Sequence, residues 1–469
     1  MELPPEVWGM LAVALLLRLP GLLSFDLWQD EIYSIYEARY LHRSPIGPGG
    51  MELRPLYFLL LHPLADAWPR ATALLRLPSL LFGLAGIVAT WWLTRRYAGR
   101  AAAFVALVVV TLLPFHINAS QMLRWISLVF LLGALLAHAV ILAMESDARR
   151  HHLTTLGLVL AGSLTHVTFL MPLTGLVLGA HLIRDDGRPG LRWPTRRALL
   201  LCWLPYVAVL GAYYAVLFAV LPTERLLGDA TGGAPGRLLP AVFYHLTPAL
   251  IATAAVGGWW LYMAGSTPQR RMAAMAAFGL VLPLLLMQVA GTRALVPVSV
   301  LYLSAALPAF LVACGAAVNL LDMTRHAARS ALVMALILGA SLMPGTVSHL
   351  LDGSRFEFRR PLQEVRRQDP QGTVLVYPVI HARWETPELD AVEFRPALGV
   401  PFLDSLRVAR HDFWVVAPLR RMGMAGDGGG DKLRWLQRLC TLERAYRHPR
   451  FDFERYDTEL YRCGAPAAP

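Results

Sequence analysis

The chain has 469 residues, of which 56% are hydrophobic and only 16% are charged, and its mean hydropathy is +0.48. A soluble domain keeps about 25% charged residues, so this composition excludes an ordinary soluble globular protein. The net charge of +11 does not indicate a nucleic-acid partner, because the arginines are scattered among loops between apolar runs. Those runs recur from residue 7 to residue 350 and have membrane-spanning length, which predicts a polytopic α-helical membrane protein.

The first apolar run, about 7–25, is interpreted as a retained span and not as a cleaved signal peptide. Residues 1–6 lack a basic n-region, and the run contains Arg18 and Pro20 without a clear cleavage site. Polar Thr165-His166 predicts an outward turn that divides a later long run. In chain order, the predicted spans are 7–25, 77–94, 101–116, 125–144, 153–166, 168–183, 198–220, 247–265, 272–290, 295–318 and 331–350, about eleven helices.

The arginines indicate how these spans are oriented. If the N-terminus is cytoplasmic, the inner loops hold most of the arginines, among them Arg149, Arg150 and the five between Arg184 and Arg197. The positive-inside rule favours this orientation. An odd number of spans then puts the C-terminal tail outside the cytoplasm, together with the first loop at about 26–76.

The first loop is long for a membrane-protein connection, and long loops are commonly functional. Within it, the spacing of apolar residues over 31–41 predicts a helix lying in the membrane interface. The Pro- and Gly-rich stretch 44–50 ends that helix, and a second apolar run follows over 53–64. We therefore predict a transmembrane domain over 1–350 that includes this loop and its interfacial helices.

The tail, 351–469, predicts a small extracytoplasmic α/β domain. Residues 373–377 and 413–416 are typical of short buried strands, and 431–446 predicts a helix. The glycines of 423–430 are too irregular for a phosphate-binding loop.

The four cysteines fall in two groups. Cys202 and Cys314 lie within predicted spans, as buried apolar residues. Cys440 and Cys463 lie in the predicted outer domain, where disulfides persist, so a bridge between them is possible. The sequence has no His/Cys cluster with zinc-ligand spacing, and no metal site is predicted on that basis.

Two adjacent carboxylates, Asp30 and Glu31, follow the first span at its predicted outer end. Acids favour helix N-termini, so capping alone explains one of them. Two acids at a membrane boundary also suit acid–base chemistry on a lipid-linked substrate. Trp28 beside them is typical of an interface anchor, and Glu52 is a further carboxylate of the same loop with a weaker claim.

Several cationic and polar residues share the predicted outer side. Arg54 could reach to lipid headgroups or bind a lipid-linked phosphate, which suits the arginine fork. Arg124 enters an apolar span and needs a partner, and Arg293 is the single charge between two apolar runs. His116, Gln121 and His166 also lie at outer helix ends. There is no acid in the middle of a span, which argues against ion-coupled transport.

The order of these motifs resembles a known family. It is similar to the bacterial branch of the C-type, polyprenyl-phosphate-dependent membrane glycosyltransferases, which are related to protein O-mannosyltransferases and the lipid A aminoarabinose transferase. The resemblance is densest over 20–130. The residues that carry it are Trp28-Gln29-Asp30-Glu31 with Ser34, Arg54-Pro55-Leu56-Tyr57, Leu75-Arg76-Leu77-Pro78-Ser79-Leu80-Leu81-Phe82-Gly83, Ser120-Gln121-Met122-Leu123-Arg124 with Ser127-Leu128, and Arg293 with Pro297.

The chain departs from the family pattern at several positions. Arg54 stands where members often have a first proline, and resembles the basic residue that the lipid A transferase has there. Met122 and Ile126 stand where the pattern of the bacterial branch has an acid and a tyrosine. These departures are consistent with a different acceptor or a diverged activity.

The resemblance implies a GT-C-like fold and an inverting sugar transfer to an acceptor hydroxyl on the extracytoplasmic side of a bacterial inner membrane. Asp30 would be the general base, Glu31 would orient it or bind the acceptor, and Arg54 with Arg124 or Arg293 would bind the donor phosphate. Trp28, Glu52, Tyr57, His116, Gln121 and His166 are further pocket candidates.

No cofactor is required by this scheme, although a divalent cation could bind at Asp30 or Glu31. The expected partners are a polyprenyl-phosphate sugar such as an undecaprenyl-phosphate sugar, a glycan, lipid or protein acceptor, and membrane lipids. Two other functions remain open. A transporter or flippase for a lipid-linked glycan would share the spans and outer arginines but need no base. A non-catalytic envelope assembly protein would tolerate loss of both Asp30 and Arg54.

Overall fold

The computed structural model describes residues 3–41, 54–220, 238–292, 299–321, 326–351, 358–376, 379–393, 400–409, 412–418, 430–446 and 458–464. The chain divides into two compact units. The first comprises Met1–Leu23 and Ser34–Leu350, and the second comprises Ser24–Tyr33 and Leu351–Pro469.

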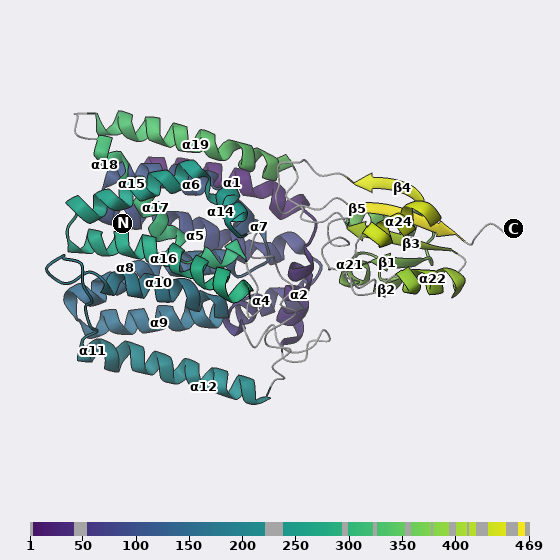
Figure 1. Cartoon of the computed structure of the whole chain (residues 1–469), viewed down its shortest axis with the longest axis horizontal. Helices are drawn as coiled ribbons and strands as arrows, with labels where there is room; N and C mark the ends of the chain where they lie inside the picture. The colour runs from purple at the N-terminus through teal and green to yellow at the C-terminus, as the bar shows by residue number, and fades with distance from the viewer. Residues whose placement is uncertain are drawn as a thin grey trace. The chain divides into compact units, whose positions relative to one another are not determined.

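The first unit is a bundle of helices (Figure 1). Its elements are α1 (Pro5–Ser24), α2 (Gln29–Tyr40, which begins in the second unit), α4 (Pro55–Ala67), α5 (Thr72–Ala98), α6 (Arg100–Leu112), α7 (Pro114–Gln121), α8 (Ile126–Ser146), α9 (Arg149–Thr165), η2 (Val167–Phe169), α10 (Leu170–His181), α11 (Arg196–Ala198), η3 (Leu199–Trp203), α12 (Leu204–Val220), α14 (Leu238–Leu246), α15 (Pro248–Ala264), α16 (Thr267–Thr292), η5 (Val300–Leu303), α17 (Leu307–Ala316), α18 (Val318–Leu321) and α19 (Ala327–Leu351).

Within the described residues, six helices are long and apolar enough to cross a membrane. Two bent pairs, α6 with α7 and α14 with α15, raise the number to eight if each is one span. This confirms the predicted polytopic helical class, while the predicted count of eleven spans is not confirmed. The expected turn after 153–165 is present, because α9 ends at Thr165 and the His166 ring accepts a hydrogen bond from the Thr168 N–H.

Small residues let the helices of this unit pack closely. A Cβ added at Gly257 of α15 would overlap the Ala313 carbonyl of α17, and one at Gly175 of α10 would overlap the Phe278 carbonyl of α16. Close packing on small residues is the usual basis of helix association in lipid, where the hydrophobic effect gives no advantage to contact.

The bend of 57° between α6 and α7 is caused by Pro114, which cannot donate a backbone hydrogen bond. The carbonyls freed at the bend are bound by other helices. Arg18 Nη1 of α1 lies 3.4 Å from the Thr111 carbonyl, and Thr346 Oγ1 of α19 donates to the Leu112 carbonyl at 2.7 Å. The bend is therefore fixed by side chains of α1 and α19.

The second unit contains a five-stranded mixed sheet of order β2-β1-β3-β5-β4. Strand β1 pairs in parallel with β2 and β3, and β5 pairs antiparallel with β3 and β4. The elements are α20 (Arg359–Gln368), β1 (Thr373–Val376), α21 (Ile380–Glu385), β2 (Asp390–Glu393), α22 (Val400–Ala409), β3 (Asp412–Pro418), α24 (Gly430–Leu439), β4 (Thr441–Tyr446) and β5 (Thr458–Gly464).

The sheet has a hydrophobic core on each face, because successive strand residues point to opposite sides. Val374 and Val376 pack with residues of α20 and α21, whereas Leu375 between them packs with residues of α22 and α24. Trp28, from the short N-terminal segment of this unit, packs against the first of these cores. This arrangement confirms the predicted small α/β domain.

One predicted element of this unit is wrong in part. The expected helix over 431–446 is α24 only as far as Leu439, and 441–446 forms β4. The reason is tertiary: β4 pairs with β5 over residues 458–462. A pairing partner so far along the chain outweighs the local helical pattern.

Cys440 and Cys463 form a disulfide that joins the start of β4 to β5. Reducing it, or replacing both cysteines by serine, is expected to lower the free energy of unfolding of the second unit by about 2–4 kcal/mol, because the closed loop restricts the unfolded chain. Hydrogen exchange of the full-length protein in detergent measures this effect as lost protection in β4 and β5. Replacing buried Cys202 by serine is the control and should leave those strands protected; equal exchange with and without the disulfide would contradict the prediction.

Candidate active site

The N-terminus of α2 holds both predicted catalytic carboxylates. Glu31 is buried, and its Oε2 accepts a hydrogen bond from the Trp28 N–H at 2.9 Å, while the Ile32 N–H donates to the Trp28 carbonyl at 3.1 Å. A glutamate at the third helical position that binds the N-cap amide is half of a capping box. Glu31 therefore fixes the start of the helix, and Asp30, half-buried in the same turn, is left more accessible.

The next turn of α2 carries Ser34, four residues after Asp30 and so on the same face of the helix. Ser34 is buried, and its Oγ lies 3.4 Å from Nη1 of Arg124. Arg124 follows α7 and precedes α8, in the loop that the sequence placed at the outer side. This contact joins segments 90 residues apart.

Two further predicted residues support the same loop. The Arg124 carbonyl accepts a hydrogen bond from Ser79 Oγ of α5 at 3.1 Å, and Ser79 Oγ lies 3.4 Å from the Tyr57 hydroxyl of α4. Tyr57 is thus a buried support of the Arg124 backbone. Arg54, immediately before Pro55 at the start of α4, lies over the Phe58 ring at 5.5 Å.

An aromatic stack adjoins these arginines. The rings of Trp125 and His166 are stacked with centroids 3.7 Å apart, and Tyr302 of η5 lies 5.9 Å from His166. Arg54 and Arg124 both interact electrostatically with the His166 ring. We call Arg54, Arg124, Trp125, His166 and Tyr302 the outer arginine site.

Two buried polar atoms at or next to the outer arginine site have no hydrogen-bond partner among the described residues. They are Nε1 of Trp125 and Oγ of Ser127, two residues further along the chain. A buried N–H without an acceptor costs about 1–3 kcal/mol, so an oxygen-rich guest beside Arg124 would be stabilised here.

Two predicted pocket residues have different neighbours. His116 and Gln121 of α7 are buried against α1, where His116 Nδ1 lies 2.8 Å from Arg18 Nη2 and Gln121 Nε2 donates to the Arg18 carbonyl at 3.0 Å. Gln121 Oε1 lies 2.5 Å from His349 Nε2 of α19. These contacts hold α7 against α1. The predicted Glu52 and Arg293 lie outside the described residues.

The sequence missed several residues that this geometry brings forward. Tyr302 is one tyrosine within an apolar run and carried no signal. Trp125 follows the motif residue Arg124 directly, and nothing in the sequence indicates its stack with His166. In the sequence, Arg18 indicates only that the first apolar run is not a signal peptide. In the structure it is fully buried, and its side chain is hydrogen-bonded to His116 of α7.

A metal site is not assembled among the residues that the structure describes, since no group of three or more His, Cys, Asp or Glu side chains could hold an ion. Asp30 and Glu31 provide two carboxylates, and one Glu31 oxygen already binds the Trp28 amide. A divalent cation at this pair stays a prediction.

No protein-family model matches the chain, and no curated protein matches its sequence. Solved structures do match. ArnT from Cupriavidus metallidurans is similar over 97% of both chains in its apo state, with 14% sequence identity and a TM-score of 0.60. The same enzyme bound to undecaprenyl phosphate is similar over 99% of both chains, with 13% identity and a TM-score of 0.61.

An oligosaccharyltransferase from Archaeoglobus fulgidus is also similar, over 91% of this chain and 70% of that one, with 11% identity and a TM-score of 0.55. The chain therefore shares the fold of these two proteins over almost its whole length. This likeness confirms the GT-C-like fold class that the sequence predicted. At such low sequence identity, the structural likeness establishes the fold alone and not the reaction.

Proposed function

We propose that this protein is an integral-membrane glycosyltransferase that moves a sugar from a polyprenyl-phosphate donor to an acceptor hydroxyl. The observation that carries the proposal is the outer arginine site, which brings Arg54 and Arg124 near the aromatic stack of Trp125 and His166 in a chain that shares the fold of ArnT. ArnT, which shares that fold, binds undecaprenyl phosphate. Paired guanidinium groups match the oxygens of such a phosphate.

The proposed donor site uses the outer arginine site for the phosphate. Arg54 and Arg124 offset the negative charge that grows on the departing lipid phosphate. Stabilisation of developing charge is usually the largest single contribution to catalysis. The Trp125 N–H donates to an oxygen of the donor, and Arg293 is a third cation for the same phosphate. The apolar surfaces of the spans hold the polyprenyl chain.

The proposed acceptor side uses Asp30. The acceptor oxygen attacks the anomeric carbon as the bond from that carbon to the phosphate oxygen breaks, and Asp30 takes the proton of the attacking hydroxyl. A single displacement inverts the anomeric configuration. Glu31 acts through its hydrogen bond to Trp28, which holds the turn that carries Asp30.

We propose further that transfer takes place on the extracytoplasmic face of a bacterial inner membrane, with the N-terminus in the cytoplasm and the second unit outside. The support is the arginine distribution of the loops, since basic loops stay in the cytoplasm. The donor sugar and the acceptor class, whether glycan, lipid or protein, are not specified by these residues.

Donor turnover tests the proposal. Purified full-length protein in detergent, incubated with a panel of radiolabelled polyprenyl-phosphate sugars and candidate acceptors, is expected to release lipid phosphate from one donor and to form a glycoside of inverted configuration, read by NMR. A retained configuration would contradict the single displacement. Absence of turnover with every donor, together with movement of a lipid-linked sugar across vesicles, would favour the transporter or flippase; absence of both activities would favour an assembly protein.

A further inference from the structure

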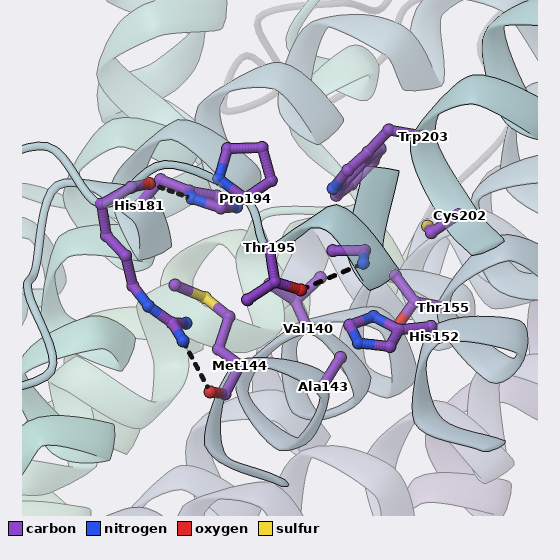
Figure 2. A pocket seen from close by; sticks show the side chains of 12 residues that line it. Val140, Ala143, Met144, His152, Thr155, His181, Pro194, Thr195, Cys202 and Trp203 are labelled. Atoms are coloured by element: carbon purple, nitrogen blue, oxygen red, sulfur yellow. Dashed lines mark hydrogen bonds between the residues drawn. The ribbon is translucent and has the colours of Figure 1, made fainter. Parts of the chain in front are cut away.

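A cavity lies among residues of α8, α9, the end of α10 and the segment η3 (Figure 2). It is far from the outer arginine site. Ala143 in its wall is 17 residues along α8 from Ile126, which corresponds to about 25 Å of helix. The loops at this end carry five arginines and two aspartates between Arg184 and Arg197. The positive-inside rule places these loops in the cytoplasm.

The polar rim of the cavity is held by the residue that ends α8. Asp147 accepts hydrogen bonds from His152 Nε2 at 2.7 Å and from Thr195 Oγ1 at 2.8 Å, and these bonds hold the pKa of Asp147 below its ordinary value. Arg197 Nη1 donates to the Asp147 carbonyl at 2.7 Å. The rim is therefore fixed in place without a ligand.

The interior of the cavity suits an apolar guest. Val140, Ala143 and Met144 of α8 form one wall, and Cys202 and Trp203 of η3 form another. Figure 2 shows these side chains gathered with Pro194 around the space. Among the described residues, no lining side chain has a buried polar atom without a hydrogen-bond partner.

The other side of η3 is apolar and exposed. Leu200 of η3 and Leu204 of α12 are 54% and 55% exposed, and only 17% of the most apolar stretch of Arg196–Leu217 is buried. Trp193, at the rim, is 76% exposed, as expected for a tryptophan at the membrane interface. Segment η3 is π-helical, a distortion that is frequent at functional sites.

The rim also supplies positive charge. Arg196 lies between two lining residues, Thr195 and Ala198, and is exposed. Its guanidinium has no hydrogen bond or ion pair to any residue that the structure describes. An apolar cavity behind an exposed apolar helix, with a cation beside it at the interface, is an arrangement that suits an anionic lipid.

We propose that this cavity binds an anionic glycerophospholipid, with the end of one acyl chain between α8 and η3 and the phosphate at Arg196. The site is independent of sugar transfer and of the outer arginine site. Its occupant strengthens the packing of the lipid-exposed α12 against the bundle.

Photocross-linking tests this site in the full-length protein in an uncharged detergent. The probes are phosphatidylglycerol and phosphatidylcholine that carry a diazirine at the end of one acyl chain, with modified residues mapped by mass spectrometry. Phosphatidylglycerol is expected to label 140–144 and 202–203 in preference to phosphatidylcholine. Arg196→Ala should lower that labelling about fivefold, because one arginine near an anionic headgroup strengthens binding by about that factor.

Arg188→Ala is the matched control, because Arg188 is exposed on the same loop and, unlike Arg196, is not adjacent in the chain to a residue that lines the cavity. It should leave labelling unchanged in uncharged detergent. Ala198→Phe fills the cavity and should abolish labelling; Ala143→Leu does so with a smaller side chain if the first variant is not monodisperse.

Three results would overturn the proposal. They are equal labelling by both lipids, an equal loss in the Arg188 and Arg196 variants, and labelling confined to residues outside the cavity.

Discussion

Asp30→Asn is expected to lower kcat for sugar transfer by about 10²–10⁴-fold, the usual contribution of a positioned general base. The amide keeps the size of the side chain and cannot take the acceptor proton. Because the proposed donor contacts lie at the outer arginine site, the dissociation constant for the lipid-phosphate donor should stay close to that of the wild type. Single-turnover release of lipid phosphate and equilibrium binding of the donor measure the two quantities separately.

Glu31→Gln is the matched control for Asp30→Asn. The glutamine side chain keeps an oxygen that can accept the Trp28 N–H, so the cap of α2 persists. We expect a loss of less than about tenfold in kcat, since uncharged capping retains most of its energy. If the two variants lose activity equally, Asp30 is not distinguished as the base; if Asp30→Asn retains turnover, the base lies elsewhere.

Arg124→Ala is expected to lower kcat/KM by about 10²–10³-fold, because removing one donor aimed at developing charge has that effect. Unlike Asp30→Asn, it should also weaken binding of the free polyprenyl phosphate. Arg124→Lys should restore part of both, since lysine supplies the charge without the two-pronged geometry. The measurements are steady-state transfer and competition by polyprenyl phosphate.

Arg95→Ala provides the control for charge loss in the same bundle. Arg95 is exposed in the last turn of α5, at the other end of the helix from the Ser79 that binds the Arg124 carbonyl. Its substitution should leave donor binding and transfer unchanged. If Arg124→Ala binds polyprenyl phosphate with wild-type affinity, Arg124 is not part of the donor site.

The local features of the site were predictable from sequence. Helix α2 begins within two residues of the predicted start, because acids in the first turn are a local signal for a helix N-terminus. The Pro- and Gly-rich stretch after the helix is a local signal for its end. The turn at His166 was found for the same reason, since two polar residues interrupt a long apolar run.

The partners within the site were not predictable. Ser34 and Arg124 are 90 residues apart, and His166 meets Tyr302 only because α9 and η5 pack in one bundle. Hydropathy indicates which end of a span is polar and not which spans are neighbours. The same limit explains β4, whose strand conformation depends on pairing with β5.

His116 and Gln121 illustrate a second limit. Polar residues at an outer helix end are equally consistent with a substrate pocket and with a structural network. Their bonds to α1 depend on Arg18, 98 residues before His116, which hydropathy treats as an isolated charge in an apolar run.

The bonds made by Arg18 have a consequence for how the protein is made. Helix α1 leaves the ribosome before α7 and α19, and at that stage the Ala14 carbonyl of its own helix is an acceptor for Arg18. His116 follows nearly a hundred residues later, and His349, which binds Gln121, lies in α19. A charged side chain in a membrane core is costly without partners, so α1 reaches its final surroundings only after α7 and α19 have been inserted.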